Sequence, residues 1–229
     1  MSTYVLTGAG SGIGRLVAER LHARGDTLIL IARDDRRAAD LTAAFPGAVA
    51  VASDLADPTA LADAVAAALP EAIDGIVHAA GIVELGTVAE LPVDAWTSQL
   101  TVNLVAPAEL TRLLLPRVRA ARGQVVFVNS GAGLTAHAGW AAYAASKHGL
   151  KALADALRSE EAEHGVRVTT VYPGRTATPM QETGHAQEGA AYDPDRWIDP
   201  ESVATVILTA LDLPRDAVMS DLTVHPGPR

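Results

Sequence analysis

Short apolar runs alternate along the chain with longer segments in which apolar residues recur at helical spacing. The run at 125–128 is apolar throughout, which is typical of a strand covered on both faces of its sheet. Such runs predict strands at residues 4–7, 27–32, 48–52, 73–79, 125–129, 166–172 and 218–224. The helical spacing predicts helices at residues 12–24, 35–44, 58–69, 93–121, 140–164 and 200–211. This order predicts an α/β fold, a doubly wound parallel Rossmann-like sheet of about seven strands with helices on both faces.

Residues 179–200 interrupt the alternation. This segment is predominantly polar and contains Pro179, Gly184, Gly189, Pro194 and Pro200, together with Met180, Tyr192 and Trp197. A long irregular segment inside a compact domain is usually functional or mobile. We interpret it as a candidate lid over a substrate, and the alternative is a solvated crossover without substrate contact. No repeat or linker divides residues 1–229, so we expect a single domain.

Composition excludes several classes of function. The net charge is −9 and no basic stripe is present, which argues against nucleic acid and anionic membranes as partners. The chain has no cysteine, so disulfides and thiolate chemistry are excluded, and its seven histidines suggest no metal set. No apolar run approaches the roughly 18 residues that a membrane span needs. A strand starts too near the N-terminus for a signal peptide, so we expect a cytoplasmic protein.

A glycine-rich turn joins the first strand to the first helix. Gly8, Gly12 and Gly14 follow the strand at 4–7. Glycines there let the backbone approach a pyrophosphate, and the helix N-terminus offers free N–H groups to the anion. The spacing differs from the common G-x-G-x-x-G fingerprint, because position 13 is Ile. The alternative is a glycine-rich turn that binds no ligand.

Tyr143 and Lys147 form a candidate acid–base pair. Residues i and i+4 lie on one face of a helix, so the phenol and the ammonium would be neighbours. A nearby cation favours the phenolate and would lower the pKa of the tyrosine from about 10 toward working pH. The same spacing also occurs by chance on solvated helix faces.

Several motifs in order resemble the short-chain dehydrogenase/reductase family, in its compact single-domain branch. They are the glycine turn with Thr7, Asn103, Ser130, the Tyr143–Lys147 pair and the segment Pro173–Thr178. The resemblance covers essentially the whole chain and implies a nicotinamide cofactor. The cofactor-binding residues it implies are Gly8, Ser11, Gly12, Ile13, Gly14, Arg33, Asp54, Leu55, Ala79, Ala80, Gly81, Asn103, Tyr143, Lys147, Pro173, Gly174, Thr176 and Thr178.

Two positions depart from the family pattern. Residues 78–81 read His-Ala-Ala-Gly, where the family usually has asparagine before the Ala-Gly pair. The missing asparagine normally steadies the central sheet. Asn129 stands where the family often has a first serine, while Ser130 keeps the catalytic position.

The resemblance implies roles for four residues. Ser130 would polarise a substrate carbonyl, and Tyr143 would transfer the proton. Lys147 would hold the nicotinamide ribose and lower the pKa of Tyr143. Asn103 would link Lys147 to solvent through its backbone carbonyl and a water.

The position after the second strand bears on the choice of cofactor. Ala32 occupies the place where an acidic residue would bind the ribose of NAD, and Arg33 follows it. A guanidinium suits the 2′-phosphate of NADP. Arg36 and Arg37 could also bind this phosphate, although the negative charges of Asp34 and Asp35 reduce the positive potential there. NADP(H) is therefore favoured over NAD(H).

We predict an NADP(H)-dependent oxidoreductase that interconverts a carbonyl and a secondary alcohol. The expected substrate wall is largely apolar and includes Leu134, Trp140, Met180 and Tyr192, which favours a ketone or aldehyde with a hydrophobic part. The alternatives are an NAD-dependent alcohol dehydrogenase and a catalytically silent NADP-binding sensor or scaffold. The resemblance suggests a homodimer or homotetramer formed through helices 93–121 and 140–164.

Overall fold

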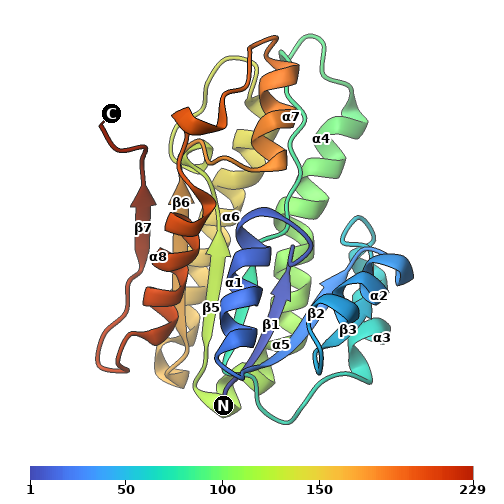
Figure 1. Ribbon diagram of the computed structural model, residues 1–229, viewed down its shortest axis with the longest axis vertical. Coiled ribbons are helices and arrows are strands. Elements are labelled where there is room, and N and C mark those ends of the chain that lie inside the picture. The colour runs from blue at the N-terminus through green and yellow to red at the C-terminus, as the bar shows by residue number, and fades with distance from the viewer. Residues whose placement is uncertain (229) are drawn as a thin grey trace.

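The computed structural model describes residues 1–228, and in them seven parallel strands form one sheet (Figure 1). The strands are β1 (Thr3–Thr7), β2 (Thr27–Ala32), β3 (Val49–Ala52), β4 (Gly75–His78), β5 (Gln124–Val128), β6 (Arg167–Pro173) and β7 (Asp221–Val224). Their order is β3-β2-β1-β4-β5-β6-β7, with every neighbouring pair parallel. The chain changes direction across the sheet between β1 and β4. A crevice at the carboxyl ends of the strands is expected at such a point.

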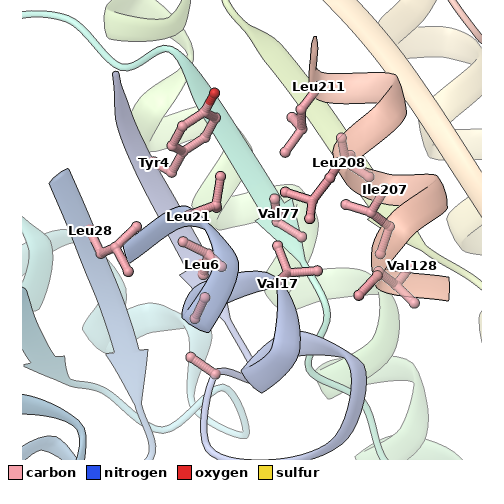
Figure 2. Close-up of a cluster of buried hydrophobic side chains, with 14 of the residues drawn as sticks. Tyr4, Leu6, Val17, Leu21, Leu28, Val77, Val128, Ile207, Leu208 and Leu211 are labelled. Carbon is pink, nitrogen blue, oxygen red and sulfur yellow. The ribbon is translucent and has the colours of Figure 1, made fainter. Parts of the chain in front are cut away.

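Helices cover both faces of the sheet. On one face lie α1 (Gly12–Ala23), α2 (Asp35–Ala44) and α8 (Pro200–Asp212). Figure 2 shows the core between α1, α8 and the strands, where Leu21 and Leu208 meet Val77. On the other face α3 (Leu61–Ala66), α5 (Ala106–Ala121) and α6 (Ala141–Glu161) bury a second apolar cluster. This arrangement confirms the predicted fold class.

The predicted helix 93–121 is divided. It consists of α4 (Val93–Leu100), a π-helical turn (Thr101–Val105) and α5. The N–H of Ala106 donates to the carbonyl of Thr101, five residues back. Pro107 has no N–H, so it cannot make the α-helical hydrogen bond to the carbonyl of Asn103. The proline thus explains both the widened turn and the place of Asn103 within it.

The segment after β6 is more regular than its composition predicts. Residues 179–187 form a helix, α7 (Pro179–Gln187), and a 3-10 turn follows at Pro194–Arg196. The hydroxyl of Thr178 accepts from the N–H of Gln181, and Pro179 occupies the first turn. The prediction of an irregular segment was therefore wrong for its first half. Figure 1 shows α7 at the carboxyl end of the sheet.

None of the helices within residues 1–228 combines the length and the apolar content needed to cross a bilayer.

Candidate active site

A cleft of about 1350 Å³ lies at the carboxyl ends of the strands. The loops after β1, β2, β3, β4, β5 and β6 line it, together with residues of α7. All the predicted cofactor and catalytic residues line this cleft except Asn103. Asn103 lies behind the wall and is 1% exposed.

The glycine turn forms a tight backbone cradle at one end of the cleft. Gly8 and Gly12 adopt positive φ angles of 76° and 53°. A Cβ on Gly14 would lie 2.5 Å from the carbonyl oxygen of Gly8, so no larger residue fits there. The hydroxyl of Thr7 accepts from the N–H groups of Ala79 and Ala80, both at 3.1 Å, and fixes the turn to the end of β4. This shape at the start of α1 fits the pyrophosphate of a dinucleotide.

Ser130, Tyr143 and Lys147 meet in the middle of the cleft. Ser130 follows β5, and its Oγ accepts from the N–H of Ala132 at 3.1 Å. Burial raises the pKa of Tyr143 to about 12, while a hydrogen bond with Ser130 lowers it. Nζ of Lys147 lies 5.8 Å from the centroid of the Tyr143 ring and donates to the carbonyl of Val128 at 3.1 Å. Burial lowers the pKa of Lys147 to about 8.

The direction of the pKa shift of Tyr143 differs from the expectation. The i, i+4 spacing predicts a lowered pKa, but burial of the phenol outweighs the other effects in this structure. Burial disfavours the charged form of any acid, and sequence spacing does not reveal it.

The side chain of Asn103 holds the loop after β4. Its Nδ2 donates to the carbonyl of Ile82 at 2.9 Å and to Oγ of Ser146 at 3.0 Å, and its Oδ1 accepts from the N–H of Ile82 at 2.9 Å. Gly81 is pressed against this amide, since a Cβ there would lie 3.1 Å from Oδ1 of Asn103. Asn103 thus joins the loop after β4 to α6.

The two departures from the family pattern have structural roles. His78 is buried, stacks on Phe127 with ring centroids 5.0 Å apart, and bonds Oγ1 of Thr111 at 2.9 Å through Nε2. Burial lowers the pKa of His78 to about 3, so the ring is neutral at pH 7. Asn129 donates from Nδ2 to the carbonyl of Lys147 at 3.0 Å, and its Oδ1 accepts from the N–H of Ser130 at 2.9 Å. This bridge between Ser130 and Lys147 was not predicted from the sequence.

Cationic side chains stand near the end of β2. Arg33 and Arg37 line the cleft, whereas Arg36 does not. The side chain of Arg33 is 66% exposed, and its Nε lies 3.6 Å from a carboxylate oxygen of Asp34. Asp34 also caps α2 by accepting from the N–H of Arg37 at 2.8 Å. The guanidinium of Arg33 therefore faces the nucleotide end of the cleft with one weak acidic neighbour.

The substrate side of the cleft is partly as predicted. Trp140 and Met180 line it, and Trp140 meets the edge of Tyr143 with ring centroids 5.7 Å apart. Leu134 is 44% exposed and lies outside the lining. Tyr192 also lies outside the lining, because its ring packs on His185 at 5.3 Å. Arg175 and Glu188, which were not predicted as site residues, both line this end.

Comparison with known proteins decides the family. A family model described as short chain dehydrogenase matches residues 2–189. The chain belongs to the short-chain dehydrogenase/reductase family. This membership confirms the resemblance seen in the motifs, and it agrees with the fit of the glycine cradle to a nicotinamide dinucleotide.

Relatives within the family cover nearly the whole chain. A short-chain type dehydrogenase/reductase of Sinorhizobium fredii is 32% identical over 227 residues, which are 97% of this chain and 90% of that protein. The 1-deoxy-11-beta-hydroxypentalenate dehydrogenase of Streptomyces exfoliatus is 35% identical over 230 residues, covering 95% and 82% of the two chains. A crystal structure of a short chain dehydrogenase from Escherichia coli complexed with NADPH superimposes with a TM-score of 0.84 at 27% identity, covering 97% of this chain and 95% of that one.

The glycine cradle gives a test of cofactor binding. Gly14→Ala should weaken the binding of NADPH at least about tenfold, because the new methyl group must push the start of α1 away from Gly8. Gly227→Ala is the control, since a Cβ on Gly227 has no atom within 4 Å and this residue lies outside the cleft lining. Cofactor affinity is measured by titration calorimetry, with thermal melting to show that both variants are folded. Equal affinities in the two variants would contradict the assignment of the cradle.

Proposed function

We propose that this protein is an oxidoreductase that transfers hydride between NADP(H) and a carbonyl or secondary-alcohol substrate, with Tyr143 as the acid–base group. The observation that carries the proposal is the meeting of Ser130, Tyr143 and Lys147 in the same cleft as the glycine cradle. Bound NADPH supplies the hydride. The cradle, Ala79–Gly81 and Pro173–Thr178 would hold this cofactor.

Each residue of the centre has a distinct role in the proposal. Ser130 donates a hydrogen bond to the substrate oxygen, and Tyr143 gives that oxygen a proton during reduction. In oxidation the phenolate of Tyr143 accepts the proton of the alcohol. Lys147, with its ammonium held at Val128, stabilises the phenolate and binds ribose hydroxyls.

The pKa of Tyr143 favours the acid role at neutral pH. A value of about 12 leaves the phenol protonated and ready to donate. Oxidation requires the phenolate and should therefore accelerate as the pH rises. The carbonyl of Asn103, which lacks its α-helical partner because residue 107 is proline, suits a relay through water to Lys147.

The walls of the cleft favour a substrate with a hydrophobic part. Ala132, Tyr143 and Ala144 form a small apolar cluster, against which Val83, Leu85 and Trp140 pack. Met180 reaches from α7 toward Gly81, with Cε 3.7 Å from where a Cβ on that glycine would lie. A ketone or aldehyde would thus lie between apolar side chains and beneath α7.

The guanidinium of Arg33 supports NADP(H) over NAD(H). Its side chain also pairs with Asp34, and the alternative is therefore an NAD-dependent enzyme, which experiment can distinguish. A silent binding protein is the other alternative, and the presence of Ser130, Tyr143 and Lys147 together speaks against it. A cytoplasmic location and assembly into a homodimer or homotetramer stay predictions of the sequence.

The role of Tyr143 is tested by Tyr143→Phe. The variant should bind NADPH as the parent does but lose turnover by about 10²–10⁴, because only the acidic hydroxyl is removed. A panel of ketones and aldehydes, assayed with NADPH at the nicotinamide absorbance, first identifies a substrate. Retention of more than about a tenth of kcat, with chemistry limiting turnover, would show that Tyr143 is not the proton donor.

The cofactor preference is tested by Arg33→Ala. This variant should raise the KM for NADPH at least about tenfold and leave that for NADH unchanged, since a hydrogen bond to a charged group contributes about 1.5–3 kcal/mol. Arg36→Ala, which removes a neighbouring cation outside the cleft lining, is the control. Equal effects on both cofactors, or a parent enzyme that prefers NADH, would favour the NAD-dependent alternative.

A further inference from the structure

An ion pair closes the outer wall of the cleft. Arg175 follows β6, and Glu188 follows α7. Nη1 and Nη2 of Arg175 each donate to one carboxylate oxygen of Glu188, both at 2.7 Å. This bidentate geometry is among the stronger forms of ion pair.

Aromatic rings surround the guanidinium. Its central carbon lies 5.6 Å from the ring centroid of Trp140 and 5.3 Å from that of Trp197. Nη1 also lies 3.2 Å from Nε2 of His185. These contacts hold Arg175 in one orientation, as expected for a cation stacked on aromatic faces.

The pair is connected to the reaction centre through Trp140. Nε1 of Trp140 donates to Oε1 of Glu188 at 3.1 Å, and the ring of Trp140 meets that of Tyr143. Both Arg175 and Glu188 line the cleft, with side chains 34% and 22% exposed. A substrate whose carbonyl lies at Ser130 and Tyr143 would therefore extend toward this pair.

The charges at this end cancel. Hydrogen bonding by Arg175 lowers the pKa of Glu188, so the carboxylate is ionised at neutral pH. A carboxylate on a substrate would find both Nη atoms of Arg175 already bonded to Glu188. It would also be repelled by the negative charge of Glu188. An uncharged substrate meets neither obstacle.

We propose that Glu188 is a specificity-determining residue, which neutralises Arg175 and so selects uncharged carbonyl substrates over those that carry a carboxylate. The inference rests on the proposed function, because it places the substrate carbonyl at Ser130 and Tyr143. Removing the charge of Glu188 exposes a preorganised guanidinium and turns the outer wall into a carboxylate-binding site.

The test measures binding rather than turnover. Protein saturated with NADP⁺ cannot reduce a ketone, so titration calorimetry gives the affinity of a matched probe pair, 4-acetylbenzoate and 4-acetylbenzamide. The parent should bind the amide more tightly. Glu188→Gln should shift the affinity ratio at least tenfold toward the carboxylate, while the glutamine can still accept from Trp140.

Two variants separate specificity from simple loosening of α7. Glu182→Gln removes a charge from α7, the helix that Glu188 follows, at an exposed position outside the cleft lining, and should keep the parent ratio. The double variant R175Q/E188Q should lose the gain of E188Q, because the exposed guanidinium is gone. A purely structural role for the pair would instead change the affinities of both probes equally.

The outcomes distinguish this inference from the proposed function. An unchanged ratio in E188Q, or a shift that persists in R175Q/E188Q, overturns the specificity role even if the parent reduces neutral ketones. Failure of the parent to reduce any carbonyl with NADPH overturns the proposed function, while the binding ratios still decide the role of Glu188. Absence of binding by both probes to every variant overturns the inference.

Discussion

The site depends on one buried cation. Lys147 is 4% exposed, and within the described part of the chain its ammonium has one hydrogen-bond partner, the carbonyl of Val128. An ammonium has three N–H donors, and leaving donors unsatisfied away from water is costly. The remaining donors face a cleft that also contains Tyr143. Lys147 is thus prepared for hydroxyl groups that enter the cleft, and burial has already lowered its pKa to about 8.

The elements around Lys147 are arranged to keep it in place. Asn129 ties the end of β5 to the carbonyl of Lys147, and Asn103 ties the loop after β4 to Ser146 beside it. Asn103 lies in the π-helical turn, and Asn129 lies in the loop after β5. Their side chains therefore join α6, the π-helical turn and the loops after β4 and β5 around Lys147. Hydrogen bonds of this kind hold catalytic groups in the geometry that proton transfer requires.

Much of this arrangement follows from the sequence. The apolar runs are long and regular enough to predict the sheet, and the glycine turn and Tyr143–Lys147 pair are local patterns. Pro107 and the Thr178–Pro179 step carried local signals for the divided helix and for α7 that composition obscured. The pKa of Tyr143 and the Arg175–Glu188 pair were beyond prediction, because burial and the contact of α7 with the loop after β6 arise only in the folded chain.

The charge distribution along the cleft also emerges only in three dimensions. At the nucleotide end, nitrogens of Arg33 and Arg37 lie 3.6 Å and 4.0 Å from carboxylate oxygens of Asp34 and Asp40. At the substrate end the charges of Arg175 and Glu188 cancel. The proposed preferences for NADP(H) and for an uncharged substrate concern these two ends of the cleft.

The most direct test of the central claim is the pH dependence of alcohol oxidation in Lys147→Met. Single-turnover rates are compared near pH 7, where Lys147 with its pKa of about 8 is still charged, and near pH 9, where it is mostly neutral. We expect Lys147→Met to be at least about tenfold slower than the parent near pH 7, since an opposite charge within about 4–6 Å shifts a pKa by about 1–3 units, and we expect this ratio to shrink near pH 9. Lys151→Met, one turn further along α6, should keep the parent profile. The same ratio of parent to Lys147→Met rates at both pH values, with the fold intact, would show that the buried cation does not control the tyrosine.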